Sequence, residues 1–169
     1  MSYKEHRELS KDTPVRCGIL TVSDTRTEET DTSGALIRDR LREAGFDVSA
    51  YHIVRDEPDE IGAALDTYCE ECEAVLISGG TGVSRRDTTI EVVSSRLEKT
   101  LPGFGEIFRM LSYEEIGAGA MLSRATAGLY RDTLIFSMPG STNAVGLALE
   151  KLIVPELHHL VWEIVRQAR

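Results

Sequence analysis

Strand-like and helix-like segments alternate through the first half of the chain. Apolar stretches predict strands at residues 15–23 and 74–78, and alternating apolar and polar residues predict a strand with one less buried face at 46–54. Between them, residues 34–45 and 58–72 carry apolar side chains on one helical face. Two parallel strands need a crossover connection, which is usually a helix. The alternation therefore predicts a mostly parallel sheet with helices on both of its faces.

The second half of the chain adds further helices and one hairpin. Two short strands between residues 123 and 138 are expected to join near Arg131 and Asp132. Helical periodicity predicts helices at residues 89–97, 102–117, 144–152 and 154–169. The predicted fold class is α/β: a three-layer, doubly wound, mostly parallel sheet with a small hairpin near the C-terminal half.

The helix expected at residues 102–117 has an apolar stripe. Its apolar side chains recur at i, i+3, i+4 and i+7, namely at Phe104, Ile107, Phe108 and Leu111. This spacing predicts that the helix lies on the core.

The length and composition indicate one domain. Residues 1–14 are polar and end in Pro14, which predicts a flexible N-terminal arm, and residues 15–169 suffice for a single domain. The net charge of -9 argues against nucleic-acid or anionic-membrane partners. The sequence lacks a signal peptide and any apolar run long enough to span a bilayer, so we expect a cytoplasmic protein.

A glycine-rich loop, "SGGTGVSRRDTTIE", occupies residues 78–91 after the third predicted strand. Gly79, Gly80 and Gly82 allow close backbone approach, so consecutive N–H groups can point at one anion beside a helix N-terminus. The spacing matches neither the P-loop nor the G-x-G-x-x-G fingerprint. Two interpretations stay open on spacing alone: a phosphate cradle and an ordinary glycine-rich turn.

A second loop of the same kind, "SMPGSTNAV", spans residues 137–145. It leaves an apolar strand, passes through Gly140, and offers Ser141, Thr142 and Asn143 as helix caps and donors. In open α/β sheets ligands bind beyond the carboxyl ends of the strands. Two such loops therefore favour a ligand with phosphates at more than one point.

Two aspartates are candidate metal ligands. Asp87 lies in the first loop, where it would repel a phosphate unless a hard cation such as Mg2+ lay between them. Asp56 follows the second predicted strand and belongs to the same sheet edge. The alternative for Asp87 is a cap or dipole partner of the helix that it precedes. Arg85, Arg86 and Arg109 are candidate charge stabilisers or solvated surface residues.

The two loops resemble a known pair of motifs. "SGGTGVSRRDTTIE" resembles the GGTG-x-x-x-RD-x-TPE signature of the molybdopterin adenylyltransferase-like family, and "MPGST" resembles its second signature. The likeness covers nearly everything from Val15 and is closest to the B-type branch. It implies a doubly wound α/β domain of the molybdopterin-binding type that assembles as a homotrimer or homohexamer.

The resemblance also implies a chemistry. The adenylyltransferase members of this family transfer AMP from Mg-ATP to the terminal phosphate of molybdopterin and release pyrophosphate. The implied catalytic residues and Mg2+ ligands are Asp56 and Asp87. The implied phosphate-binding residues are Ser23, Gly79, Gly80, Thr81, Gly82, Pro139, Gly140 and Ser141.

Further expectations concern cofactors and partners. Mg2+ is the expected ion and ATP a substrate, with no tightly bound cofactor. A downstream metal-insertion enzyme is a possible partner. The alternative is a catalytically silent paralogue that binds pterin or acts as a scaffold. The sequence leaves three points open. They are whether the cofactor metal is molybdenum or tungsten, whether the oligomer is a trimer or a hexamer, and which phosphate each loop binds.

One position departs from the family signature. Ile90 stands where the signature has proline, so the helix start loses a preset φ angle. Thr88 and Glu91 are spaced for a capping box that would compensate.

Two other patterns favour roles outside a metal site: core packing for a cysteine pair, and a surface or interface position for a histidine pair. Cys69 and Cys72 form a C-x-x-C, but both extend an apolar helical stripe and acidic neighbours disfavour a thiolate. His158 and His159 are adjacent on a helix and point to different faces, so they make a poor metal pair.

Overall fold

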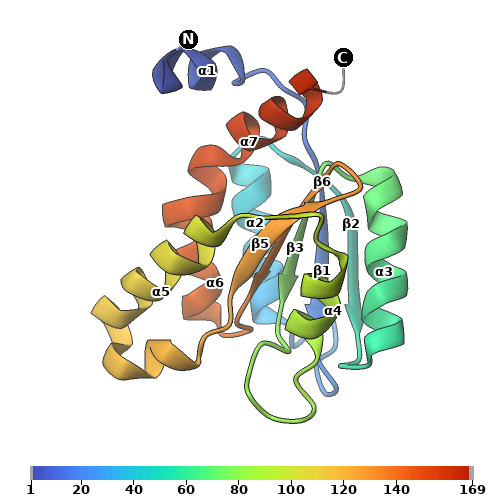
Figure 1. Ribbon diagram of the computed structural model, residues 1–169. Helices are drawn as coiled ribbons and strands as arrows, with labels where there is room; N and C mark the ends of the chain where they lie inside the picture. The colour runs from blue at the N-terminus through green and yellow to red at the C-terminus, as the bar shows by residue number, and fades with distance from the viewer. Residues whose placement is uncertain (1, 168–169) are drawn as a thin grey trace.

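The computed structural model describes residues 2–167, with side chains to residue 164. A six-stranded sheet in the order β2-β1-β3-β6-β5-β4 forms its centre (Figure 1). The strands are β1 (Arg16–Val22), β2 (Asp47–Val54), β3 (Ala74–Ser78), β4 (Lys99–Thr100), β5 (Thr126–Tyr130) and β6 (Thr133–Met138). The first four in this order are parallel, and β5 runs antiparallel to both of its neighbours. The predicted α/β fold with a mostly parallel sheet is confirmed.

Helices cover both faces of the sheet (Figure 1). α3 and α4 pack on one face, while α2, α5, α6 and α7 pack on the other. The helices are α1 (Tyr3–Leu9), α2 (Thr32–Glu43), α3 (Pro58–Glu71), α4 (Thr89–Arg96), α5 (Pro102–Ile116), α6 (Thr142–Ala148) and α7 (Val154–Gln167). A 3-10 segment, η1 (Gly117–Leu122), follows α5, and a π-helical segment, η2 (Leu149–Ile153), joins α6 to α7.

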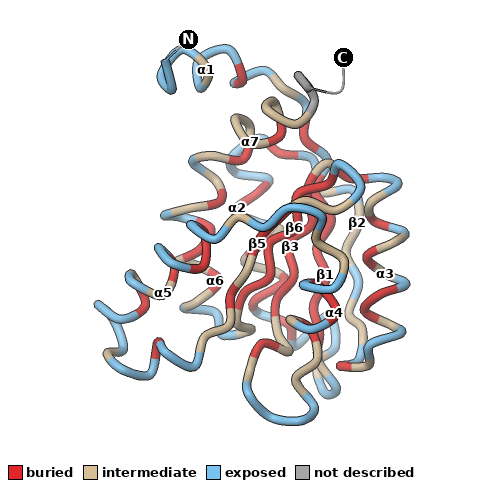
Figure 2. Tube along the Cα trace, viewed as in Figure 1, coloured by how far each residue is buried: buried red, intermediate tan, exposed pale blue. Residues whose placement is uncertain are grey.

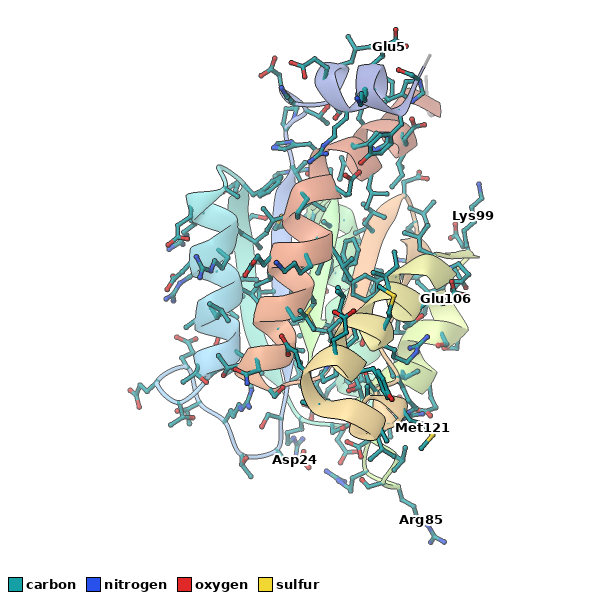
Figure 3. All side chains as sticks on the ribbon, turned by 90° about the vertical axis from the view of Figure 1, so that its left-hand side faces the viewer. Glu5, Asp24, Arg85, Lys99, Glu106 and Met121 are labelled. Atoms are coloured by element: carbon teal, nitrogen blue, oxygen red, sulfur yellow. The ribbon has the colours of Figure 1, made fainter. Side chains whose placement is uncertain are left out.

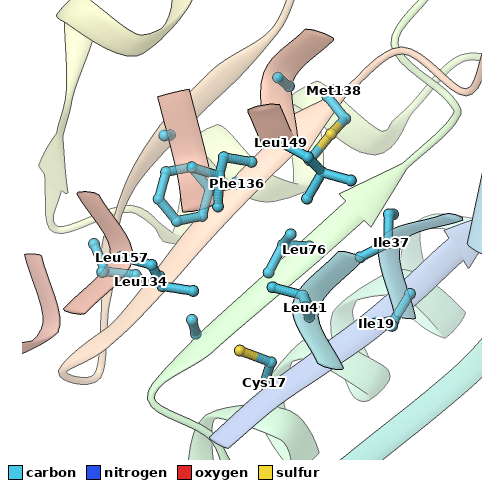
Figure 4. Packing of buried hydrophobic residues seen from close by; sticks show 14 of the residues in the cluster. Cys17, Ile19, Ile37, Leu41, Leu76, Leu134, Phe136, Met138, Leu149 and Leu157 are labelled. Atoms are coloured by element: carbon cyan, nitrogen blue, oxygen red, sulfur yellow. The ribbon is translucent and has the colours of Figure 1, made fainter. Parts of the chain in front are cut away.

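Two apolar cores lie on the two faces of the sheet. The larger core joins Ile19, Leu76 and Phe136 from the strands to side chains of α2, α5, α6 and α7 (Figure 4). The smaller core lies under α3 and α4. Strands β3 and β6 are buried along their whole length (Figure 2), which is why both read as nearly continuous apolar runs.

The predicted hairpin joins β5 to β6. Arg131 and Asp132 form its tip with φ angles of 47° and 62°. Two consecutive positive φ values are typical of a type I′ turn, whose twist matches that of the flanking strands. Strand β6 therefore pairs in parallel with β3 on one side and antiparallel with β5 on the other.

Some elements were not predicted from the sequence. β4, η1 and η2 are short, and α1 lies in the segment expected to be an arm. Tyr3 and His6 of α1 hydrogen-bond to Glu156 and Glu163 of α7. The division into an arm and a domain that begins at residue 15 stays a prediction. Within residues 2–167, no helix combines the length and the apolar character needed to cross a membrane.

Helix α5 lies on the core with only part of its apolar surface. Phe104 and Phe108 are buried, whereas Ile107 is 44% exposed. The exposed face continues into η1 and comprises Ile107, Met110, Tyr113, Ile116, Met121 and Leu122. Figure 3 shows Met121 at the outer end of this unit. Only part of the predicted apolar stripe is therefore buried within one chain.

Candidate active site

A cavity of about 590 Å3 lies beyond the carboxyl ends of β1, β3 and β6. The sheet order changes direction between β1 and β3, which is the place where open α/β sheets bind ligands. Its size lies within the usual range of small-molecule sites. All eight predicted phosphate-binding residues line it: Ser23, Gly79, Gly80, Thr81, Gly82, Pro139, Gly140 and Ser141.

The two glycine loops meet at Gly79 and Gly140. A Cβ atom on Gly140 would lie 3.2 Å from Gly79 Cα, and one on Gly79 would lie 2.2 Å from the carbonyl oxygen of Val22. Gly79 also has a φ of 98° and donates its N–H to the carbonyl of Met138 at 3.1 Å. The ends of three strands can converge here only because these positions have no side chain.

Asp87 lines the cavity from the far side of the first loop. Its Oδ2 atom accepts a hydrogen bond from the N–H of Ser84 at 2.9 Å. A Cβ atom on Gly82 would lie 2.6 Å from the same oxygen, so the carboxylate rests against Gly82. The carboxylate thus closes its own turn and is also the acidic group that the cavity presents.

Asp56 lies behind the loop. It is 8% exposed, and its Oδ1 atom accepts from the N–H of Thr88 at 3.0 Å and from the Thr88 hydroxyl at 2.7 Å. Among the described residues, the cavity lining includes Asp87 and does not include Asp56. A Cβ atom on Gly80 would lie 2.7 Å from Asp56 Oδ2, so this oxygen is separated from the cavity only by the loop backbone.

The predicted capping box at the start of α4 is wrong. The Thr88 side chain makes no cap hydrogen bond to the helix and donates to Asp56 instead. Glu91 pairs with Arg124. A hydrogen bond to a charged carboxylate is roughly twice as strong as one between neutral groups, so the Thr88 side chain is directed to Asp56 and away from the helix.

Arg26 is a cavity-lining cation that the sequence did not reveal. Its guanidinium donates to the Gly140 carbonyl at 3.1 Å and lies 3.4 Å from Asp31. Burial would raise the pKa of Asp31, but hydrogen bonds from Gly34 and Tyr51 and the charge of Arg26 hold that pKa below its ordinary value. Asp31 therefore stays charged and fixes Arg26 at the second loop.

Arg124 holds the first loop from outside. Its guanidinium donates to the carbonyls of Thr81 and Gly82, at 3.2 and 2.5 Å, and pairs with Glu91. The ion pair lowers the pKa of Glu91. Arg124 comes from the segment before β5, far from the loop in sequence, so no local pattern marks it.

The three arginines singled out from the sequence lie elsewhere. Arg86 pairs with Asp24 at 2.8 Å and Glu57 at 2.9 Å, and Arg109 donates to the Ala125 carbonyl at 3.0 Å. Arg85 projects away from the molecule (Figure 3). Among the residues that the structure describes, none of these three lines the cavity.

The remaining wall of the cavity is apolar. It comes from α5 and η1 and includes Phe108, Ile116, Ala120 and Leu122. The cavity thus has a polar floor of glycine N–H groups, Arg26 and Asp87, and an apolar wall, the combination usual in small-molecule sites.

The C-x-x-C cysteines and the two adjacent histidines lie outside this cavity. Cys17, Cys69 and Cys72 are free thiols, and burial raises the pKa of each. His158 packs against Phe46, with ring centroids 4.4 Å apart, while His159 faces α1. The two histidines do point in different directions.

Comparison with known proteins identifies the family. A family model described as "Probable molybdopterin binding domain" matches residues 18–159, which contain every residue of the cavity lining. Molybdenum cofactor biosynthesis protein B of Bacillus subtilis strain 168 is 54% identical over 167 residues, covering 97% of this chain and 98% of its own. The chain belongs to the molybdenum cofactor biosynthesis protein B family. The Staphylococcus carnosus member is 46% identical over 98% of this chain and 100% of its own.

Solved structures of the molybdenum cofactor biosynthesis protein B family share the fold. A crystal structure of a protein of that name superposes with a TM-score of 0.89 at 52% identity, covering 92% of this chain and 98% of its own. The tungsten cofactor synthesizing protein MoaB of Pyrococcus furiosus gives 0.82 at 39% identity, covering 89% and 97%. The resemblance of the two loop motifs to this family is therefore confirmed over almost the whole chain.

Proposed function

We propose that this protein acts in molybdenum or tungsten cofactor biosynthesis as a molybdopterin adenylyltransferase. In this reaction an oxygen of the terminal phosphate of molybdopterin attacks the α-phosphorus of ATP. The bond from that phosphorus to the β-phosphate oxygen breaks, and pyrophosphate leaves. The observation that carries the proposal is the meeting of the two glycine loops at Gly79 and Gly140 around one cavity.

The proposed work of the protein is positioning. Backbone N–H groups of residues 80–82 bind phosphate oxygens, and Ser141 and Arg26 offer donors on the opposite side of the cavity. In phosphoryl and nucleotidyl transfer, much of the rate enhancement comes from holding the two anionic substrates in a fixed geometry. Which phosphate group binds to which loop stays open, because the cavity lining offers donors on both sides.

The residues present fit a magnesium ion. Asp87 provides carboxylate oxygen at the cavity, and oxygen is the ligand type that Mg2+ prefers. Asp56 Oδ2 lies behind Gly80 and is a less direct ligand, since Asp56 Oδ1 is already held by Thr88. When bound, Mg2+ neutralises charge on the triphosphate and the leaving pyrophosphate. ATP enters this scheme as a substrate.

The alternative function is a catalytically silent pterin-binding or scaffold protein. One observation favours it: both aspartates already bond within or behind the loop, Asp56 to Thr88 and Asp87 to Ser84. A protein that only binds pterin would need the loop geometry and not the metal. Ile90, in place of the family proline, would matter little to such a protein.

We also propose that the chain forms a homotrimer or homohexamer. The exposed apolar face of α5 and η1 supports this, since exposed apolar patches of this kind mark association surfaces. Light scattering on Met110→Glu and on Met121→Glu tests the assembly, and a change to a smaller particle is expected for at least one of them.

Incubation with molybdopterin, ATP and Mg2+ tests the proposed reaction. Adenylylated pterin and pyrophosphate in equal amounts are expected. Absence of both products in a preparation that binds both substrates favours the silent alternative. We place the reaction in the cytoplasm, and a downstream metal-insertion enzyme is the partner that would take up the activated pterin.

A further inference from the structure

Two histidines and a glutamate cluster at the end of the molecule opposite the cavity. Helix α1 lies against α7 there, far from the loops beyond the carboxyl ends of the strands (Figure 1). His6 comes from α1, and His159 and Glu163 come from α7. One ligand atom from each lies within 4.8 Å of the others.

The donor atoms face one another. His6 Nδ1 lies 2.7 Å from Glu163 Oε1, and His159 Nε2 lies 3.6 Å from the same oxygen. The side chains of His6, His159 and Glu163 are 18%, 14% and 28% exposed, so solvent reaches the cluster although it is largely covered. One glutamate oxygen thus has an imidazole nitrogen on either side.

Glu156 orients one of the histidines. Its Oε2 atom lies 3.1 Å from His159 Nδ1, and its Oε1 atom accepts from the Tyr3 hydroxyl. A neutral imidazole that donates from Nδ1 carries its lone pair on Nε2, the atom that faces Glu163. Metal-bound histidines commonly have their second nitrogen fixed in this way by a carboxylate.

The local charge also suits a cation. Glu156 and Glu163 supply two carboxylates, and Arg7 lies 3.7 Å from Glu156 as a partial counter-charge. With neutral histidines this group carries a net charge of one negative unit. A divalent ion bound by His6 and Glu163 would take the place of the hydrogen bond between them.

We propose that His6, His159 and Glu163 bind one divalent transition-metal ion of the zinc type, with water as the fourth ligand. Two imidazole nitrogens and one carboxylate oxygen are a donor set that zinc uses, whereas Mg2+ and Ca2+ take oxygen ligands. The ion ties α1 to α7. This site is independent of the proposed adenylyl transfer, since its residues lie outside the cavity lining.

The histidines were overlooked in the sequence for a physical reason. His159 was considered only with its neighbour His158, which faces the Thr13 carbonyl and Phe46. The true companion of His159 is His6, 153 positions away. Only the packing of α1 on α7 brings the two rings together, with centroids 6.2 Å apart.

Zinc titration of the full chain tests the proposal. The protein is freed of metal with EDTA, dialysed, and titrated with Zn2+ in the presence of a competing chromophoric chelator. One tightly bound ion per chain is expected. His6→Gln and His159→Gln should each weaken binding by at least about 100-fold, and Glu156→Gln by about 10- to 100-fold.

His158→Gln is the matched control, because it removes an imidazole from the same helix without touching the cluster. Its zinc affinity should equal that of the wild type. His6→Gln lies on α1, outside the two cores, so the sheet domain should stay folded in that variant. Circular dichroism checks this for each variant.

Limited trypsin digestion gives a second readout. Zn2+ should slow cleavage after Lys4 and Arg7 at least tenfold in the wild type and in His158→Gln, and should leave it unchanged in His6→Gln. Wild-type zinc binding no tighter than that of the His6→Gln, His159→Gln double variant would overturn the proposal. Equal cleavage rates with and without Zn2+ in the wild type would contradict the tie between α1 and α7.

Discussion

Asp56 accepts two hydrogen bonds from Thr88 on a single oxygen, from the backbone N–H at 3.0 Å and from the hydroxyl at 2.7 Å. This contact joins the end of β2 to the end of the glycine loop at the start of α4. A residue chosen from the sequence as a metal ligand thus also holds the loop that carries the other candidate ligand, Asp87.

Asp56→Ala should therefore destabilise the fold. Two donors of the half-buried Thr88 lose their acceptor; an unsatisfied donor costs roughly 1–3 kcal/mol when fully buried and less when water reaches it. Asp56→Asn keeps a carbonyl oxygen as an acceptor and should lose less stability than Asp56→Ala. Urea unfolding of the three proteins measures the difference. An Asp56→Ala protein as stable as the wild type would show that the contact does not hold the loop.

Gly79→Ala should disrupt the meeting of the two loops. Alanine at a φ of 98° is strained, and its Cβ atom would lie 2.2 Å from the Val22 carbonyl oxygen. We expect a loss of at least about 2 kcal/mol in the free energy of unfolding, together with loss of ligand binding.

Gly103→Ala is the control for this change. A Cβ atom on Gly103 meets nothing within 4 Å, and the residue lies in α5. The control should be neutral or stabilising by up to about 1 kcal/mol. Equal thermal unfolding of the two variants would contradict the role assigned to Gly79.

Arg124→Ala should loosen the first loop without removing a cavity residue. The carbonyls of Thr81 and Gly82 lose their common donor. Trypsin should then cut after the exposed Arg85 and Arg86 several-fold faster than in the wild type. Arg42→Ala, on the exposed face of α2, serves as the control. Unchanged cleavage in Arg124→Ala would refute this function of the guanidinium.

Asp31 should make the stability depend on pH in the acid range. Its pKa is below the ordinary value of 3.8 in the folded chain, so its charged form stabilises the fold above that pH. At neutral pH the free energy of unfolding of the wild type should be about 1–2 kcal/mol larger than that of Asp31→Asn. The difference should shrink as the pH falls below 3.8 through the lower folded value. A difference that stays constant from neutral pH to about pH 2.5 would contradict the assignment.

Much of the fold could be predicted because its signals are local. Strands β3 and β6 are buried on both faces and have short apolar sequences, and Arg131 and Asp132 mark the turn between β5 and β6. The two glycine loops could be located for the same reason, since each loop directly follows a strand, and their phosphate binding stays a prediction. Their position around one cavity then follows from parallel strands ending at one sheet edge.

What could not be predicted depends on distant partners. Arg26 bonds to Gly140, and Arg124 to Thr81 and Gly82, across many positions of the chain. The apolar stripe of α5 has the period of a core helix, yet Ile107 is exposed because no element within the described part of the chain covers it. Periodicity reports that a face is apolar and does not report what covers it.

Pyrophosphate release by the wild type and by Asp87→Asn, with pterin binding measured in both, tests the central claim most directly. Asparagine keeps the shape of Asp87 and an acceptor for Ser84, while it removes the charge that would hold Mg2+. We predict pyrophosphate release only when molybdopterin, ATP and Mg2+ are all present. Asp87→Asn should bind pterin normally and turn over about 100-fold more slowly or worse. Equal rates in the two proteins, or a wild type that binds both substrates and releases no pyrophosphate, would contradict adenylyl transfer at this cavity.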